Sequence, residues 1–198
     1  LLFLDPNRLL NRFYSNAGLP TKGDKYGGWE SETLSGHTLG HYLSAISMMY
    51  ASTGNTEFKK RADYIVAELS RCQKARGTGY IGAIPGEDSC FYKVSKGDIK
   101  TGGFDLNGLW SPWYTVHKVM AGLADAYLYT GNQQALQALK GMSDWTATIV
   151  DPLTEEQRQK MLRCEYGGMN DVLAMVYAFT GNKKYLQLSY KFYDDFVM

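Results

Sequence analysis

The seven residues Met49-Tyr50-Ala51-Ser52-Thr53-Gly54-Asn55 carry a pattern that returns at 126–132 (AYLYTGN) and at 176–182 (VYAFTGN). In every copy a tyrosine stands three residues before Thr-Gly-Asn, an apolar stripe precedes it, and a second amphipathic segment follows at once. Glycine readily takes the left-handed conformation that ends a helix, and asparagine caps the start of the next one. The repeat therefore predicts three antiparallel helix pairs, with each tyrosine packed across its bend and its hydroxyl on a polar partner.

Helical spacing of apolar residues extends over most of the chain, which indicates an all-α fold in a single domain of residues 1–198. The expected helices cover residues 6–17, 36–53, 56–74, 112–130, 133–150, 151–162, 169–180 and 185–198. Residues 21–35 and the Gly-rich stretch 77–111 lack a sustained period, and no segment predicts a strong strand ladder. A loop as long as 77–111 inside a compact domain is commonly functional.

The composition narrows the class of partner. The 198 residues carry 21 Lys and Arg against 20 Asp and Glu, a net charge of +1, so no strong field attracts nucleic acid or an anionic membrane. The apolar runs are too short and interrupted to span a bilayer. In contrast, 15 Tyr, 8 Phe and 4 Trp accompany 21 Gly, a combination that suits stacking on flat, hydroxylated ligands.

The first and last residues of the sequence lack the usual signals of a chain start and a helix end. Leu1 lies in an apolar segment without an initiator Met, and residues 191–198 continue a helical pattern without a stop signal. We therefore expect a fragment of a longer protein. The oligomeric state stays open, and so does the compartment, although a bacterial periplasmic or extracellular location is slightly favoured over a cytoplasmic one.

Polar and aromatic residues cluster in the loops and first turns that lead into the first helix of each pair. If the pairs form a ring, these segments meet at one mouth, and this regular placement predicts a site there. The residues are Trp29, Glu30, His37 and His41 before the first pair, Trp110, Trp113, Tyr114 and His117 before the second, and Glu165, Tyr166 and Asn170 before the third.

Each histidine and cysteine has more than one interpretation. His37 and His41 have the i, i+4 spacing of a metal pair, but no metalloprotease Glu lies between them and no third ligand is evident. A buried hydrogen-bonded pair and a pair of substrate contacts both remain open, and His117 is either a core histidine or a site residue. The three cysteines have no metal-type spacing, so they are expected to be structural or incidental.

The tryptophans and acidic residues also leave alternatives. Trp29, Trp110 and Trp113 are either core or loop anchors or platforms for a sugar ring. Glu30 and Glu165 are either a general acid and base pair or solvated, helix-capping carboxylates. The spacing in sequence does not distinguish these roles.

Four segments carry a resemblance to a known family: GGWE (27–30), LSGHTLGHYLSA (34–45), WYTVHK (113–118) and EYGGMN (165–170). With them the chain resembles, over essentially its whole length, the N-terminal part of the catalytic domain of glycoside hydrolase family 127-like proteins. That group includes β-L-arabinofuranosidases and was formerly classified as domain of unknown function 1680. The resemblance implies an (α/α)6 barrel, incomplete in this chain, and retaining hydrolysis of L-arabinofuranose-containing glycans by the full-length parent.

The resemblance also implies which chemistry this chain does not carry. In such enzymes a cysteine thiolate is the nucleophile, held near zinc by Glu and Cys ligands, and a separate Glu is the acid/base. Those motifs lie further along the family's chain, and this sequence has neither an adjacent cysteine pair nor a Glu-x-Cys segment. The catalytic residues therefore stay unknown, and we expect no metal ligand or cofactor in this chain, with zinc in the full-length parent.

What the resemblance supports is a substrate pocket. The expected pocket residues are Trp29, Glu30, His37, His41, Trp110, Tyr114, His117, Glu165 and Asn170. A non-catalytic glycan-binding module and a helical scaffold remain the alternatives to a glycosidase.

Overall fold

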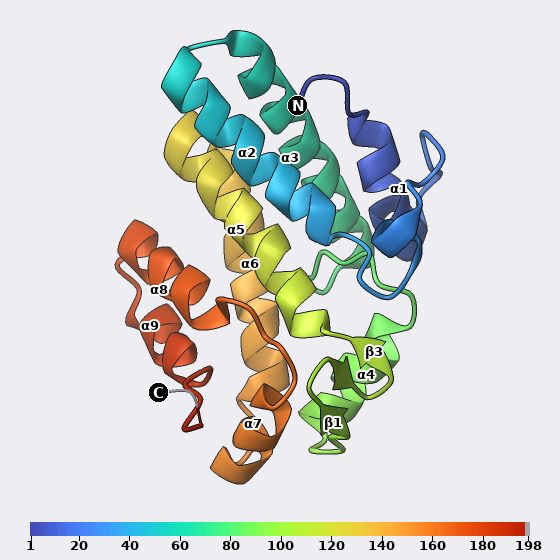
Figure 1. Cartoon of the computed structure of the whole chain (residues 1–198). Helices are drawn as coiled ribbons and strands as arrows, with labels where there is room; N and C mark the ends of the chain where they lie inside the picture. The colour runs from blue at the N-terminus through green and yellow to red at the C-terminus, as the bar shows by residue number, and fades with distance from the viewer. Residues whose placement is uncertain (197–198) are drawn as a thin grey trace.

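The computed structural model describes residues 1–196 and is built from helices in this range, as the sequence predicts (Figure 1). The helices are α1 (Pro6–Asn16), α2 (His37–Thr53), α3 (Thr56–Arg76), α4 (Glu87–Ser95), α5 (Pro112–Thr130), α6 (Gln133–Val150), α7 (Glu155–Leu162), α8 (Met169–Thr180) and α9 (Lys183–Tyr190). Three two-residue strands, β1 (Thr101–Gly102), β2 (Asp105–Leu106) and β3 (Leu109–Trp110), form one small antiparallel sheet in that order.

The helices pair into three hairpins, α2–α3, α5–α6 and α8–α9, arranged in two layers (Figure 1). The first helices of the hairpins are neighbours, α2 beside α5 and α5 beside α8, and α3 and α6 pack behind them. α1 lies against α3. In this arrangement the N-terminal ends of α2 and α5 point to the same end of the molecule, where the small sheet lies.

The three Thr-Gly-Asn turns form as predicted. Gly54, Gly131 and Gly181 all have left-handed backbone, with φ of 67°, 71° and 67°. Each glycine N–H donates to the carbonyl of the tyrosine four residues earlier, at 2.8–3.0 Å. The asparagines Asn55, Asn132 and Asn182 accept from backbone N–H groups of the next helix through their side chains.

The tyrosines before these turns behave differently from the prediction. Within residues 1–196, no hydrogen bond involves the hydroxyl of Tyr50, Tyr127 or Tyr177. The ring of Tyr127 instead packs edge-on against Phe179 of the next hairpin, with ring centroids 4.9 Å apart. Packing between hairpins therefore replaces the expected polar contact across the bend.

Two glycines bring α2 and α5 into close contact. A Cβ atom added at Gly40 would lie 2.2 Å from the Lys118 carbonyl oxygen, and one at Gly122 would lie 2.7 Å from the Gly40 carbonyl oxygen. Real Cβ atoms do not approach so closely, because side chains and backbone resist overpacking. This approach places the α5 residues 114–118 directly beside the first turns of α2.

A cluster of aromatic rings fills the core beneath the small sheet. Tyr80 stacks on Trp145 with ring centroids 3.9 Å apart, and Phe91 packs edge-on against both Trp113 and Trp145. Trp113 is 1% exposed and its indole N–H donates to the Met161 sulfur at 3.1 Å. Of the two interpretations left open for Trp113, the structure therefore supports the core anchor.

Three predicted boundaries are wrong. The segment 77–111 contains α4 and the three strands, which short, Gly-punctuated stretches do not reveal by periodicity. The helix expected from residue 151 starts at Glu155, because Thr154 and Gln157 form a reciprocal capping box that fixes the start. The last helix ends at Tyr190, so residues 191–196 form turns and irregular backbone, and the rest of that prediction, 197–198, lies outside the described residues.

Candidate functional site

The loop before α2 is attached to the helix by a buried carboxylate. Glu30 accepts from the backbone N–H of Gly36 at 2.9 Å through one oxygen and from that of Thr38 at 3.0 Å through the other. These N–H groups lie at the start of α2, where the helix itself offers them no partner. Glu30 therefore caps α2, which is one of the two roles that the sequence left open for it.

His37 and Glu30 form a buried pair. Its Nδ1 lies 3.1 Å from a Glu30 carboxylate oxygen and 2.8 Å from the Leu34 carbonyl oxygen. Burial alone raises the pKa of Glu30, but the hydrogen bonds from His37, Thr38 and Gly36 outweigh it and lower the pKa below its ordinary value. Burial likewise opposes charge on His37, yet the bonds to Glu30 and Leu34 raise the pKa of the imidazole overall. The contacts orient the ring and occupy its Nδ1.

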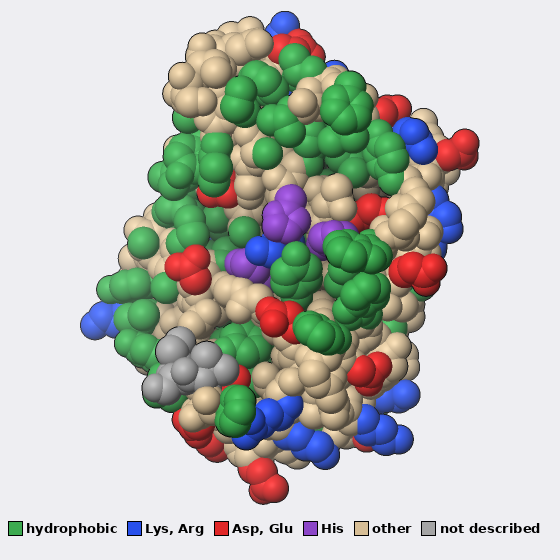
Figure 2. Space-filling view, viewed as in Figure 1, with side chains coloured by type: hydrophobic (Ala, Val, Ile, Leu, Met, Phe, Trp, Pro, Cys, Tyr) green, Lys and Arg blue, Asp and Glu red, His purple; other side chains and the backbone are tan. Residues whose placement is uncertain are grey.

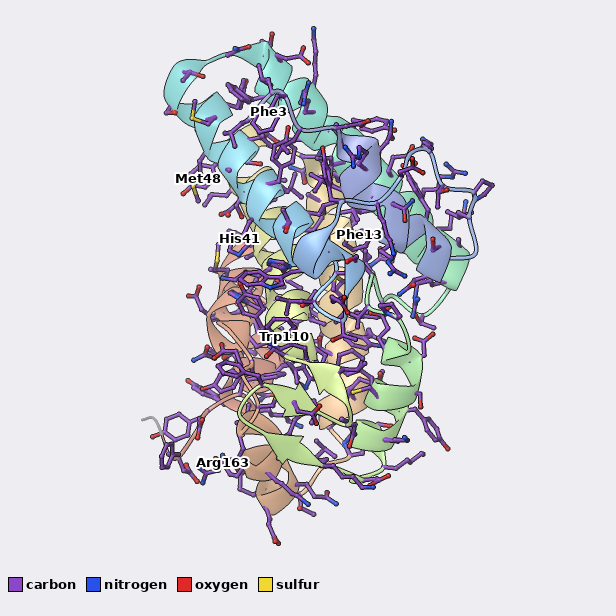
Figure 3. The ribbon with its side chains drawn as sticks, turned by 45° about the vertical axis from the view of Figure 1, so that its right-hand side comes forward. Phe3, Phe13, His41, Met48, Trp110 and Arg163 are labelled. Atoms are coloured by element: carbon purple, nitrogen blue, oxygen red, sulfur yellow. The ribbon has the colours of Figure 1, made fainter. Side chains whose placement is uncertain are left out.

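Trp29 from the loop before α2 and Tyr114 from α5 lie beside this imidazole, and Trp110 from β3 packs against Trp29. The Trp29 ring centroid lies 6.0 Å from that of His37 and 5.9 Å from that of Trp110, and the Tyr114 centroid lies 6.1 Å from His37. Trp29 is 61% exposed and Trp110 is 37% exposed, so both present ring surface to solvent. Figure 3 shows Trp110 on the small sheet, near the end of α2 that carries His41.

His41 and Lys118 lie next to this aromatic group. The Nε2 of His41 is 3.2 Å from the Tyr114 hydroxyl, and the Lys118 ammonium lies 5.1 Å from the centre of the Tyr114 ring. Burial lowers the pKa of His41, and the charges of Lys118 and His37 lower it further. Figure 2 shows all three histidines of the chain gathered on one face around a basic side chain.

Lys118 is a site residue that the sequence prediction missed. Its charge acts on His37, His41 and His117 alike, which places it among the three rings. The available signal was its position four residues after Tyr114, on the same face of α5. A lysine beside a buried histidine in sequence is ordinarily assigned to a solvated face, so this signal is weak.

His117 lies at the back of the same face and remains neutral. Its Nδ1 is buried without a hydrogen-bond partner within residues 1–196. Gly167 and Gly168 lie so close to the ring that a Cβ at either would come within 3.0 Å of an imidazole nitrogen. Burial first, then the charges of Lys118 and His41, lower the pKa of His117 to about 4.

Glu165 and Asn170 occupy different places. The Glu165 carboxylate accepts from the Gly167 N–H at 2.9 Å. It also borders a small hollow of about 200 Å³, hereafter the inner hollow, which is lined by Leu34, Phe104, Trp110, Ser111, Tyr114 and Glu165. Asn170 lines a separate hollow with Tyr190 and Tyr193, between α8 and α9. The structure therefore brings eight of the nine predicted pocket residues to one face and leaves Asn170 elsewhere.

The residues of this chain do not fit the zinc centre that the resemblance implies for the parent. Within residues 1–196 no three or more His, Cys, Asp or Glu side chains are placed to hold a metal ion together. Cys72, Cys90 and Cys164 are buried, and burial raises the pKa of each thiol to about 12, so none is a thiolate near neutral pH. No step of a reaction is assigned to a metal here.

Across the part of the chain that the structure describes, every helix is too short or too polar to cross a membrane.

The fold and the site define a class: a protein of helical hairpins with a hollow at the N-terminal ends of neighbouring helices. Aromatic and carboxylate side chains line this hollow, and histidines lie beside it. The sequence matches the model of the β-L-arabinofuranosidase, GH127 catalytic domain, over residues 1–198, and the chain belongs to this family. The GH127 catalytic domain is an (α/α)6 barrel, and the three hairpins form part of one.

A solved structure supports the fold. The chain is similar to the crystal structure of Ara127N-Se, a GH127 β-L-arabinofuranosidase from Geobacillus stearothermophilus T6, with a TM-score of 0.64 and 18% sequence identity. The similarity covers 97% of this chain but 27% of that one, so the chain spans about a quarter of its length. No curated protein matches the sequence.

Proposed function

We propose that this chain supplies the sugar-holding wall of a retaining glycosidase that releases L-arabinofuranose from glycans. The observation that carries the proposal is the group of exposed tryptophans and oriented histidines around the inner hollow. Trp29 and Trp110 offer flat apolar surface to a sugar ring. The exposed His41 offers ring nitrogen atoms to its hydroxyl groups, and the chain belongs to a family of β-L-arabinofuranosidase catalytic domains.

The role proposed for this chain is binding and orientation of the substrate. Glu30 is occupied as a helix cap, and the three thiols stay protonated, so neither supplies a nucleophile. Glu165 is exposed beside the inner hollow and is available to accept a hydrogen bond from a sugar hydroxyl. Hydrolysis itself is proposed for the whole protein that contains this chain.

The test is hydrolysis of β-L-arabinofuranosides by the full-length protein, with the anomeric form of the released L-arabinose followed by NMR. We expect retention of configuration. Replacing the exposed His41 (His41→Ala) should lower kcat/KM about tenfold or more, because one hydrogen bond to the bound sugar is lost. Met48→Ala, an exposed position 46% accessible on the same helix, is the control and should leave kcat/KM unchanged.

The second candidate is a glycan-binding protein without turnover, which is favoured because the three cysteine thiols of the described residues are buried and protonated. Binding of arabinofuranosyl oligosaccharides by the full-length protein, without release of arabinose, would support this alternative and contradict the glycosidase. If the protein neither bound nor cleaved such glycans, both proposals would fail and a helical scaffold would remain.

A further inference from the structure

A second hollow lies on the other side of Phe104 and Trp110. It measures about 530 Å³ and is lined by Thr33, Gly102, Phe104, Asp105, Gly108 and Trp110. It is shallow and open to solvent, which suits a sugar unit that continues outward from the inner hollow. We call it the outer hollow. Phe104 and Trp110 line both hollows, so a ligand that extends past these rings from the inner hollow enters the outer one.

The two aromatic rings are held in place although they are exposed. The backbone N–H of Trp110 donates to the Thr33 hydroxyl at 3.2 Å, which attaches β3 to the loop before α2. The Ser111 N–H donates to the Phe104 carbonyl at 2.8 Å, and the Glu165 N–H donates to the Gly103 carbonyl at 2.9 Å. The sheet is thus fixed to two other loops and across its own end, while Phe104 stays 66% exposed. A well-anchored, exposed aromatic side chain is characteristic of a binding surface.

The loop between β2 and β3 and the loop before β1 add further rigidity. The Asn107 side chain accepts from the Lys100 N–H at 2.9 Å and donates to the Asp98 carbonyl at 2.9 Å. Ser111 has a φ of 42°, which is uncommon for a residue other than glycine and is unfavourable. Such strain persists where the surrounding contacts determine it, and here it directs the chain from Trp110 into α5.

The chemistry of the outer hollow matches a sugar. Phe104 and Trp110 supply apolar faces for the C–H side of a ring. On the other walls, the exposed Asp105 carboxylate and the Thr33 hydroxyl can bond sugar hydroxyls. One oxygen of Asp105 accepts from the Gly108 N–H at 3.2 Å, which orients the carboxylate and leaves acceptor capacity for a ligand. Gly102 and Gly108 contribute no side chain, so the hollow stays open.

We propose that the outer hollow binds the second sugar residue of a glycan whose terminal sugar occupies the inner hollow. This inference rests on the proposed function, because it assumes a carbohydrate at the inner hollow. It adds that the protein distinguishes an oligosaccharide from a simple glycoside, and that the sheet residues Gly102–Trp110 decide this preference.

The test compares two substrates in the full-length protein: a β-L-arabinofuranosyl disaccharide and methyl β-L-arabinofuranoside, which has no second sugar. Released L-arabinose gives kcat/KM for both. Gly102→Tyr fills the outer hollow without backbone strain, because a Cβ there meets no atom within 4 Å and the φ of Gly102 is not positive. Asp105→Ala removes the hydrogen-bonding carboxylate and serves as an independent variant if Gly102→Tyr does not fold.

Gly27→Tyr is the matched control. Gly27 also has an unobstructed Cβ position and no positive φ, and it lines neither hollow. We expect Gly102→Tyr and Asp105→Ala to lower kcat/KM for the disaccharide about tenfold, the equivalent of roughly 1.4 kcal/mol of binding. The value for the methyl glycoside should stay within about twofold, the scatter expected of distant surface changes.

The outcomes separate this inference from the proposed function. If the protein cleaves both substrates and the ratio of the two kcat/KM values is the same in the variants as in the wild type, the outer hollow is not a sugar site and the proposed function stands. If the wild-type protein cleaves neither substrate, the proposed function is overturned and this inference with it. If Gly102→Tyr and Asp105→Ala lose activity on the disaccharide but keep it on the methyl glycoside, both the proposed function and this inference are supported.

Discussion

At the scale of single residues, Glu30 connects the structure of α2 to the candidate site. Its two oxygens hold the N–H groups of Gly36 and Thr38, and one of them also contacts His37. The same carboxylate therefore starts the helix and orients an imidazole that faces the aromatic side chains of the site. A change at Glu30 should affect both stability and histidine titration.

Glu30→Gln tests this double role. The amide has a single acceptor oxygen, so one of the buried N–H partners loses its bond, which costs about 1–3 kcal/mol in the free energy of unfolding. Chemical denaturation checks the value. Glu32→Gln, an exposed position two residues later, should change the free energy of unfolding by less than about 0.5 kcal/mol. Equal stability of the two variants would contradict the capping role.

The pH dependence of this pair has two limits. The pKa of Glu30 in the folded protein is lowered. Its contribution to the free energy of unfolding is therefore present above the unfolded pKa of 4.5 and is lost as the pH falls through the folded pKa. The folded pKa of His37 is raised, so its contribution is present below the unfolded value of 6.5 and is lost as the pH rises through the folded value. We expect this part of the stability to be greatest between these limits.

The three histidines should titrate in a fixed order. The pKa of His117 is lowered to about 4, that of His41 is lowered by burial and by Lys118, and that of His37 is raised by its bond to Glu30. The chain has three histidines, so ring signals in an NMR titration can be assigned from single variants. As the pH falls, His37 should protonate first, then His41, then His117. A common midpoint near the ordinary value for all three would show that the rings are solvated and independent.

His117 also links the site to stability. Because its folded pKa lies below the unfolded value of 6.5, the unfolded chain binds the proton more tightly. The free energy of unfolding should therefore decrease as the pH falls from 6.5 towards about 4.

At the scale of helices, the close contact of α2 and α5 decides which side chains meet. His41 and Tyr114 are 73 residues apart in sequence, yet their side chains are 3.2 Å apart because the two helices approach at Gly40 and Gly122. Larger residues at these two positions would separate the helices and with them the histidines and the aromatic rings.

Gly40→Ala is the corresponding prediction. The added Cβ would meet the Lys118 backbone at 2.2 Å, and backbone cannot move aside cheaply, so we expect destabilisation by about 3 kcal/mol. Lys60→Ala, at an exposed helical position of α3, is the control and should change the free energy of unfolding by less than about 0.5 kcal/mol. Thermal unfolding of both variants checks the difference, and equal melting temperatures would contradict it.

At the scale of the whole molecule, a buried network joins the first helix to the segment that carries the sheet. The Glu87 carboxylate accepts from the Asn16 amide at 2.9 Å, from the Tyr80 hydroxyl at 2.9 Å and from the Ile84 N–H at 3.0 Å. The Arg76 guanidinium lies 3.5 Å away. These partners come from α1, the loop after α3, and α3 itself. The network therefore fixes the Gly-rich stretch that the sequence left irregular.

Glu87→Ala should destabilise the protein by about 3–5 kcal/mol, because it leaves the buried donors of Asn16, Tyr80 and Ile84 without their acceptor and removes one of the two carboxylates at Arg76. Asp88→Ala, at the adjacent position, removes an exposed partner of the same Arg76 and should cost no more than about 1 kcal/mol. Denaturant unfolding of both variants provides the comparison. A small effect of Glu87→Ala would mean that the segment 77–111 is held in place by its apolar core alone.

The sequence by itself determined the helix pairs, their turns and the family, because these depend on local or contiguous patterns. A Thr-Gly-Asn turn is complete within a few residues, so Gly54, Gly131 and Gly181 could be assigned without any tertiary contact. Only the tertiary structure decided the cap provided by Glu30, the position of Lys118 among the histidines, the outer hollow and the separate location of Asn170. These features arise where segments distant in sequence meet, and periodicity carries no information about which of two polar residues faces a neighbouring helix.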